Sequence, residues 1–362
     1  MLPTEKQIIE RIESIDFYPL KVKKISRKSL LLNKEEINPY QVGRGSYITL
    51  EWQGEKEDFV VEVKRIFTPK EVENTLLQIK NYSVSKKNLE NKEYRPLIVT
   101  PYLRLTTISR LVEEGVSGVD LCGNAIIQIP GKWFIEKIGY SNNYPDNVPI
   151  KNVFKGNTSV VGRMFLSKPL YKKVSDIEGE IVKCGGQITL GTVSKALKVM
   201  ENELIISRKD NIKLLDAGKL LELLEKNYPG IKVNKSIKGK ISSIDEFLQQ
   251  GINKEEKKEI KIVGSNVNLY AVMPASNAVT TIYTTSIEKL IRNSDFRETD
   301  KFANIEIHET EEPMVYFDRK KRNNFLWAPP LQIYLELANG GKRERETAEQ
   351  IKKNLLNFGY LE

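Results

Sequence analysis

The segment from residue 189 to residue 204 places the strongest constraint on how this chain can fold. Its apolar residues recur at steps of three and four, a spacing that puts them on one face of an α-helix packed against a core. These residues are Leu190, Val193, Leu197, Met200 and Leu204. The opposite face carries Gly191, Thr192, Lys195 and Lys198, with Ser194 at its edge. The sequence therefore predicts a helix with one buried and one polar, basic face.

The flanking residues predict a compact arrangement around this helix. Residues 157–167 have helical spacing and are followed by Pro169. A second helix is expected to open at Ser175, with Ser175 and Glu178 as a capping box, and to end at Gly185-Gly186. Residues 204–207 and 212–215 are expected to form a hairpin around a turn at residues 209–211. Three short helices followed by a basic hairpin predict a winged helix-turn-helix.

In a winged helix the N-terminal end of the third helix enters the major groove, and other elements contact phosphates. The residues expected to contact DNA are therefore Thr189, Gly191, Thr192, Ser194, Lys195 and Lys198 in the helix, and Arg208, Lys209 and Lys213 in the hairpin. The alternative is a winged helix that serves only in packing or protein–protein contact.

The distribution of charge favours DNA. Residues 151–213 hold twelve Lys or Arg against six Asp or Glu, whereas residues 1–150 hold 22 against 20 and residues 214–362 hold 23 against 22. Most of the net charge of +9 thus lies in the predicted winged helix. A basic block between two near-neutral ones is typical of a module that neutralises phosphates.

The third helix also resembles that of a group of bacterial winged-helix regulators, whose sequence reads S-x-G-T-V-S-K-x-L-x-x-L-E. Residues 189–201 of this chain read TLGTVSKALKVME. The resemblance implies a DNA-binding role for the segment.

Other classes of protein are disfavoured by what the sequence lacks. No run of about 18 apolar residues is present, and the first residues lack the apolar region of a secretory signal. Two cysteines (Cys122 and Cys184) make no disulfide framework, and the single histidine, His308, offers no His/Cys zinc cluster. No P-loop or Rossmann fingerprint occurs. We expect a cytoplasmic protein without membrane contact.

The N-terminal residues predict a separate α/β core. Strands are expected at residues 47–52 and 59–64, joined by a polar link at residues 53–58. A helix at 69–82, a strand at 96–100, a helix at 107–114 and strands at 119–121 and 126–129 follow. This order fits a restriction-endonuclease-like core.

Within that core, Glu62 and Lys64 lie on one face of a strand. They resemble the (D/E)-x-K half of the PD-(D/E)xK nuclease motif, and Gln78 with Tyr82 resembles the accompanying Q-x-x-x-Y element. The resemblance implies Glu62 as a Mg²⁺ or Mn²⁺ ligand, Lys64 as an aid to the nucleophile and Gln78 as an accessory catalytic residue. Asp120 and Asn124 are candidate groove-lining residues, and Cys122 is expected in a tight turn.

One departure from the nuclease motif predicts an inactive site. Residues 45–51 contain no aspartate, and their only acid, Glu51, adjoins the predicted hairpin link. A single carboxylate holds Mg²⁺ poorly, because the ion requires several oxygens in octahedral geometry. We therefore expect no resident cofactor, with Glu62 and Lys64 forming a structural ion pair.

A wider resemblance covers much of the chain. The runs VVEVKR (60–65), PLIVTPYL (96–103), GVSGVDLCGNA (115–125) and QIYLEL (332–337), then Arg343 and ETAE (346–349), are similar to AbiEi-like regulators of the abortive-infection type IV antitoxin superfamily. The resemblance implies a DNA-binding antitoxin or autorepressor connected with phage defence. A minimal antitoxin of this kind begins with its winged helix, whereas about 150 residues precede it here.

The remaining residues predict a C-terminal α+β domain. A helix is expected at 216–228, a linker or an exposed region within 229–258, strands at 260–263, 271–274, 280–283, 305–307 and 314–317, and a helix at 287–293. The basic cluster at 319–322 fits either a DNA contact or a turn.

Together these patterns predict an α/β multidomain protein with a nuclease-like domain at 1–150, a winged helix at 151–228 and a C-terminal domain at 229–362. We expect a regulator that binds double-stranded DNA sequence-specifically and that has no enzymatic activity of its own. A homodimer and a protein partner for the C-terminal domain stay open. The alternatives are a divalent-metal-dependent DNA endonuclease or nickase, and a host-defence or plasmid-maintenance adaptor acting through the C-terminal third.

Overall fold

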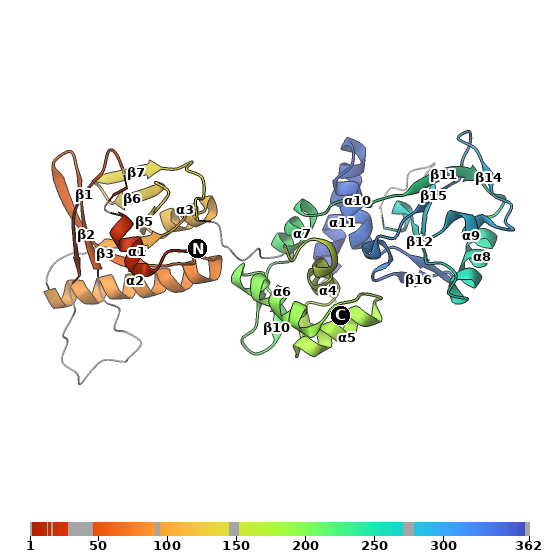
Figure 1. Cartoon of the computed structure of the whole chain (residues 1–362), viewed down its shortest axis with the longest axis horizontal. Helices are drawn as coiled ribbons and strands as arrows, with labels where there is room; N and C mark the ends of the chain where they lie inside the picture. Colours follow the sequence, from red (N-terminus) through yellow and green to blue (C-terminus); the bar gives the residue numbers. More distant parts are fainter. Residues whose placement is uncertain are drawn as a thin grey trace. The chain divides into compact units, whose positions relative to one another are not determined.

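The computed structural model divides into two compact units, residues Met1–Ile150 and Lys151–Glu362, drawn in red to yellow and green to blue in Figure 1. The structure describes residues 2–12, 14–15, 17–27, 46–90, 95–144, 152–270 and 279–358. Both units combine helices with mixed sheets, as an α/β multidomain protein requires. Among the described residues, no helix has the length and apolar character needed to cross a membrane.

The described part of the first unit is built on a seven-stranded sheet with its strands in chain order, β1 to β7. The pairs β3–β4 and β4–β5 are parallel and the other pairs are antiparallel. Helices α2 and α3 supply the crossovers that parallel pairs require. The elements are α1 (Glu5–Ile12), β1 (Lys21–Arg27), β2 (Ser46–Trp52), β3 (Glu55–Val63), α2 (Pro69–Glu90), β4 (Arg95–Thr100), α3 (Leu105–Glu113), β5 (Ser117–Asp120), β6 (Ala125–Ile129) and β7 (Trp133–Lys137).

The two faces of this sheet build two separate apolar cores. Val61 and Val99 face Ile8 of α1, whereas Val60 and Ile98 belong to the cluster that includes α2 and α3. Because side chains alternate along a strand, Glu62 is on the same face as Val60. The sheet therefore directs Glu62 towards the α2 and α3 side.

The predicted polar link at residues 53–58 is wrong. Strands β2 and β3 are joined by Gln53 and Gly54 alone, with φ angles of 50° and 84°, and residues 55–58 continue β3. Asp58 accepts a hydrogen bond from the Thr49 hydroxyl across the hairpin at 2.6 Å. The charged side chains at this end of β3 pair with the neighbouring strand and do not enter the core. The end of the strand therefore lacks apolar residues, and its sequence resembles that of a loop.

The second unit begins with three helices and a small antiparallel sheet of order β8-β10-β9. A short 3₁₀ turn precedes α4, β8 separates α4 from α5, and the β9–β10 hairpin follows α6. The predicted helix at 216–228 is α7. The elements are η1 (Gly156–Thr158), α4 (Ser159–Ser167), β8 (Leu170–Tyr171), α5 (Val174–Lys183), α6 (Leu190–Asn202), β9 (Ile206–Ser207), β10 (Ile212–Leu214) and α7 (Ala217–Lys226).

The capping box predicted at Ser175 and Glu178 is wrong by two positions. Helix α5 begins at Val174, and the Asp176 carboxylate accepts a hydrogen bond from the Lys173 backbone N–H at 3.0 Å. Only Glu178 has the Ser three residues earlier that the sequence pattern requires, since Lys173 stands three residues before Asp176. The earlier start of the helix places Asp176, not Glu178, within reach of the exposed backbone amide.

The rest of the second unit holds a second seven-stranded sheet, of order β14-β11-β15-β13-β12-β17-β16 among its described strands. One face packs against α8 and α9. The core that contains α4–α7 also takes in α10, α11 and Val263 and Tyr283 of this sheet. The elements are β11 (Lys235–Lys240), α8 (Ile244–Glu256), β12 (Ile262–Ser265), η2 (Val267–Leu269), β13 (Thr280–Thr284), α9 (Ile287–Ile291), β14 (Arg297–Glu298), β15 (Ile305–Glu309), η3 (Pro313–Tyr316), β16 (Lys320–Arg322), β17 (Phe325–Trp327), α10 (Pro330–Ala338) and α11 (Lys342–Phe358).

Two predictions in this region are wrong. Residues 229–258 do not form a linker, because they contain β11 and α8, and Ser243 caps α8 by accepting from the Glu246 N–H at 3.2 Å. Residues 314–317 lie mostly in the 3₁₀ turn η3, which opens at Pro313, and not in a strand. The strand predicted at 271–274 lies outside the described residues.

A buried polar network joins α4 to α10. The Arg163 guanidinium donates to Gln332 Oε1 at 2.7 Å, and Gln332 Nε2 donates to Glu336 Oε1 at 2.8 Å. The Tyr283 hydroxyl donates to the other oxygen of Glu336 at 3.1 Å. Burial raises the pKa of Glu336 to about 7, against a usual 4.5.

The raised pKa makes stability depend on pH. The folded protein holds a proton on Glu336 that the unfolded chain releases near pH 4.5, so this stabilisation is full below pH 4.5 and is lost as pH rises through about 7. Glu336→Gln removes that dependence. We expect urea unfolding to show the variant gaining up to about 3 kcal/mol relative to the wild type between pH 5 and pH 8. Parallel pH profiles for the two proteins would contradict the assignment.

Candidate nucleic-acid interface

Helix α6 separates a buried face from an exposed one. Val193, Leu197 and Met200 are at most 1% exposed and pack in the core of the second unit. Gly191, Lys195 and Lys198 are exposed, and Ser194 is half-buried at the boundary between the faces. The predicted stripe is wrong at its first position, because Leu190 is 46% exposed in the first turn of the helix.

Two of the predicted DNA-contacting hydroxyls hold the start of α6. The Thr189 hydroxyl accepts a hydrogen bond from the Thr192 backbone N–H at 3.3 Å and lies 3.0 Å from the Thr192 hydroxyl. This is an N-cap, which satisfies an amide that the first turn of a helix leaves unpaired. Thr189 is exposed and Thr192 is half-buried, so both remain accessible to a ligand.

The hairpin is fixed by its apolar residues and presents its basic ones. Ile206, Ile212 and Leu214 are buried in the same core as α6. Lys209 and Lys213 are exposed and Arg208 is half-buried. Figure 1 shows α6 beside the hairpin that carries β10, and α6 contacts β9 directly.

Among the described residues, the five cations of α6 and the hairpin have no acidic partner. Within the part of the chain that the structure describes, no salt bridge is made by Lys195, Lys198, Arg208, Lys209 or Lys213. Elsewhere in the same unit, Lys168 lies 2.9 Å from Glu180 and Lys219 lies 3.6 Å from Glu203. The structure therefore leaves uncompensated positive charge on the two elements for which the sequence predicts DNA contacts.

The Thr189 cap gives a prediction about stability. Thr189→Ala removes the acceptor for the Thr192 N–H, so we expect a loss of about 1 kcal/mol in the free energy of unfolding. Thr189→Ser keeps the hydroxyl and should lie within a few tenths of a kcal/mol of the wild type. Denaturant unfolding of the three proteins measures both changes, and equal stability for the alanine and serine variants would refute the capping role.

In the first unit, Glu62 and Lys64 form an ion pair at the end of β3, with 3.0 Å between Lys64 Nζ and Glu62 Oε1. Both side chains are partly exposed. Glu51 pairs with Lys23 at 3.1 Å and lies opposite Lys56 in the β2–β3 ladder. Since Lys56 precedes Glu62 by six residues, Glu51 is roughly 20 Å along the strand from Glu62.

Gln78 is not joined to this pair. Its side chain is exposed on α2, where the buried side chains among those described are Val72, Thr75, Leu76 and Ile79. Among the described residues, no hydrogen bond connects Gln78 with Glu62 or Lys64. The side chain of Tyr82 lies outside the described residues.

Asp120 and Asn124 are not groove-lining residues, because both are at least 98% buried. The Asp120 carboxylate accepts hydrogen bonds from the backbone N–H groups of Leu103, Cys122 and Asn124 and from the Asn124 side-chain amide, all at 2.7–2.9 Å. Burial nevertheless raises the pKa of Asp120. These bonds organise the turn in which Cys122 was expected.

The described residues do not supply a metal site beside Glu62. Among them, no group of three or more His, Cys, Asp or Glu side chains is arranged to hold an ion. In the β2–β3 ladder, Val61 pairs with Ser46, so the position opposite Glu62 is the one before Ser46. That position lies outside the described residues. Glu62 alone, already paired with Lys64, does not fit the several oxygen ligands that Mg²⁺ requires.

No family model, curated protein or solved structure matches this chain.

Proposed function

We propose that this protein is a sequence-specific regulator that binds double-stranded DNA through a winged helix formed by α4, α5, α6 and the β9–β10 hairpin. The observation that carries the proposal is the set of five cations on α6 and the hairpin that form no salt bridge among the described residues, opposite the buried side chains of Val193, Leu197 and Met200. Surface lysines and arginines without acidic partners are available to replace the counterions of a phosphate backbone.

In this mode, the exposed start of α6 enters the major groove. Gly191 has no atom near the space that a side chain would occupy, so the helix backbone can approach the bases closely. Thr192, Ser194 and Lys195 then reach base edges or phosphates from the first two turns. Arg208, Lys209 and Lys213 of the hairpin contact phosphates and fix the orientation of the helix.

We extend the proposal to the other parts of the chain. Residues 1–150 form a restriction-endonuclease-like domain without activity, and residues 229–362 complete an AbiEi-like regulator. Such a protein would act as an antitoxin-like repressor or autorepressor in the cytoplasm, in the setting of phage defence. The parallel β3–β4–β5 strands with crossover helices and the (D/E)-x-K pair support the first assignment.

The DNA-binding proposal predicts a steep salt dependence. With duplexes selected from a random pool by the wild-type protein, we expect a dissociation constant of roughly 10⁻⁸ M or tighter near physiological salt. Lys195→Ala with Arg208→Ala should weaken binding about 100-fold and lower the salt slope by about two. Fluorescence anisotropy across a range of salt concentrations measures both quantities.

The matched control is Lys257→Ala with Lys289→Ala, which removes the same charge from two exposed residues, one directly after α8 and one in α9. This variant should bind like the wild type. Unchanged affinity in the Lys195 and Arg208 variant, or an equal loss in the control, would refute the proposed interface.

A second candidate function is DNA cleavage by the first unit. The observation that favours it is the Glu62–Lys64 pair, which sits at the end of β3 and is accessible to solvent. In that case Glu62 would bind Mg²⁺ or Mn²⁺ and Lys64 would assist the attacking water. A further acid would be needed to complete the metal site.

We expect no metal-dependent cleavage when the protein is incubated with supercoiled plasmid and Mn²⁺ or Mg²⁺, because Glu62 has no described carboxylate neighbour. Gel electrophoresis separates nicked and linear products. Cleavage that is lost in Glu62→Gln but kept in Glu51→Gln, at the opposite end of the same hairpin, would overturn this expectation and favour the nuclease.

A further inference from the structure

A solvent-open cleft of about 520 Å³ lies in the second unit, between the end of α4, the start of α10, helix α11 and the edge strand β16. Sites for small molecules in proteins have volumes of roughly 300–1,000 Å³. Most of the described residues that line the cleft are apolar, and Leu269, Pro330 and Leu355 among them are partly exposed. The cleft therefore has the size of a ligand site and presents apolar surface to solvent.

Strand β16 adds two cations to the lining of this cleft. Lys320 and Arg322 are exposed and both line it. Because side chains alternate along a strand, these two lie on one face of β16, and Lys321 lies on the other. Lys320 Nζ is 2.7 Å from Oδ1 of Asp318, which also lines the cleft, whereas no described acid forms a salt bridge with Arg322. Two cations against one acid leave the described lining with a surplus of one positive charge.

The guanidinium of Arg322 is held in position by neutral groups. Its Cζ lies 4.7 Å from the centre of the Tyr270 ring, which lines the cleft, and its Nη1 donates to the Leu269 carbonyl at 3.4 Å. The Tyr270 hydroxyl donates to the Ala328 carbonyl at 3.1 Å, which fixes the ring. A guanidinium has five N–H donors, so this one hydrogen bond leaves most of them available to an anion.

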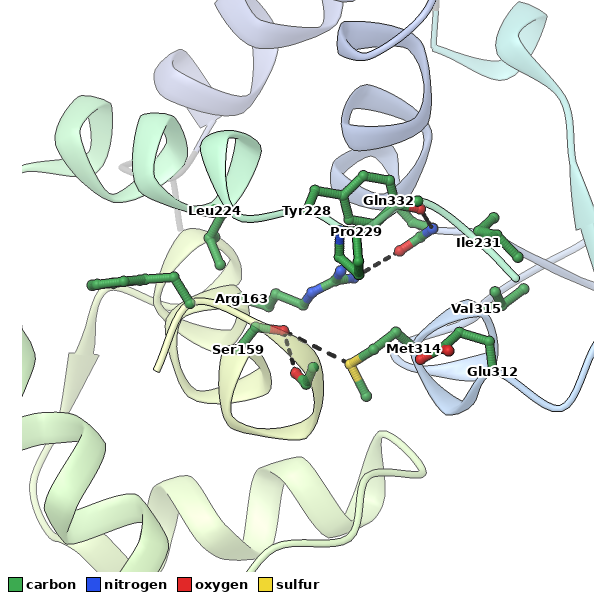
Figure 2. Close-up of a pocket in the computed structure, with 13 residues that line it drawn as sticks. Ser159, Arg163, Leu224, Tyr228, Pro229, Ile231, Glu312, Met314, Val315 and Gln332 are labelled. Carbon is green, nitrogen blue, oxygen red and sulfur yellow. Dashed lines mark hydrogen bonds between the residues drawn. The ribbon is translucent and has the colours of Figure 1, made fainter. Parts of the chain in front are cut away.

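Helices α4 and α10, which form another part of the lining, are joined inside the unit. Figure 2 shows the Arg163 side chain extending from α4 to Gln332 of α10, where its Nη1 donates to Oε1 at 2.7 Å. Leu166 follows Arg163 by one helical turn, and Leu331 directly precedes Gln332. Both leucines are buried and line the cleft. This part of the cleft is therefore formed before any ligand binds.

We propose that this cleft binds a small organic monoanion, with a carboxylate on Arg322 and Lys320 and an apolar body against Leu269, Pro330 and Leu355. The apolar surface selects the body, and the surplus of one positive charge selects a single negative charge. Inorganic phosphate or sulfate would bring more charge than the lining balances and would leave the apolar surface in water. The site is independent of the DNA-binding proposal, because its described lining contains none of the residues proposed to contact DNA.

The test compares three probes for binding to the full chain by ligand-observed NMR. Octanoate has both the carboxylate and the apolar body, octanamide has the same body without the charge, and acetate has the charge without the body. We expect octanoate to bind saturably with a dissociation constant of roughly 1 mM or tighter. Octanamide and acetate should each bind at least about tenfold more weakly, because the first lacks charge-assisted hydrogen bonds and the second lacks buried apolar area.

Variants of β16 assign the binding to the cleft. Arg322→Gln should weaken octanoate binding about tenfold and leave octanamide binding unchanged, and Lys320→Gln should also weaken octanoate binding. The matched control is Lys321→Gln, which removes the same charge from the other face of the same strand and should bind octanoate like the wild type. All three side chains are exposed, so the variants are expected to fold, and far-UV circular dichroism checks this.

Three results would overturn the proposal. The first is the absence of saturable octanoate binding, and the second is equal affinity for octanoate and octanamide, which would show an apolar surface without anion recognition. The third is an equal loss of octanoate binding in the Arg322→Gln and Lys321→Gln variants, or no loss in a folded Arg322→Gln variant.

Discussion

The packing of one face of α6 decides what the other face can do. Val193, Leu197 and Met200 enter a core that also contains residues of α10 and α11, so the helix cannot rotate about its axis without exposing apolar surface. At about 25 cal/mol per Å² of apolar area, exposing these three side chains would cost several kcal/mol. That cost keeps Lys195 and Lys198 directed at solvent. The orientation of the proposed recognition helix therefore depends on a core built partly from the last two helices of the chain.

The lack of acidic partners around this face bears on function more than on stability. Exposed salt bridges contribute little to folding, about 0–1 kcal/mol each, so pairing Lys195 or Lys213 with an acid would add little stability. Leaving such residues unpaired preserves a positive potential that can steer a polyanion to the surface. Two lysines that flank the three-helix module and do pair with acids, Lys168 and Lys219, lie outside the set predicted to contact DNA.

The sequence predicted best those elements whose signals are local. The periodic stripe of α6 and the short hairpin after it need only neighbouring residues, and both are present with boundaries within two residues. Strand β11 was missed because it depends on distant residues: Ile237 pairs with Ile307, 70 positions further along the chain. Taken alone, a segment with three lysines in six residues cannot be distinguished from a solvated linker. Asp120 was misassigned for a related reason, since a sequence shows an acid beside Gly123 and Asn124 but not the amides that surround it.

The buried network of Arg163 was also missed, although its signal is present in the sequence. Arg163 stands within VVGRMFL, where helical spacing places it among core residues, and an arginine at such a position requires acceptors. Here the acceptor is Gln332, about 170 residues away, which in turn donates to Glu336. A polar contact of this kind is poor evidence for stability, because an apolar pair of similar volume often does as well. Its consequence is geometric, because the hydrogen bond between Arg163 and Gln332 requires α4 and α10 to keep one register.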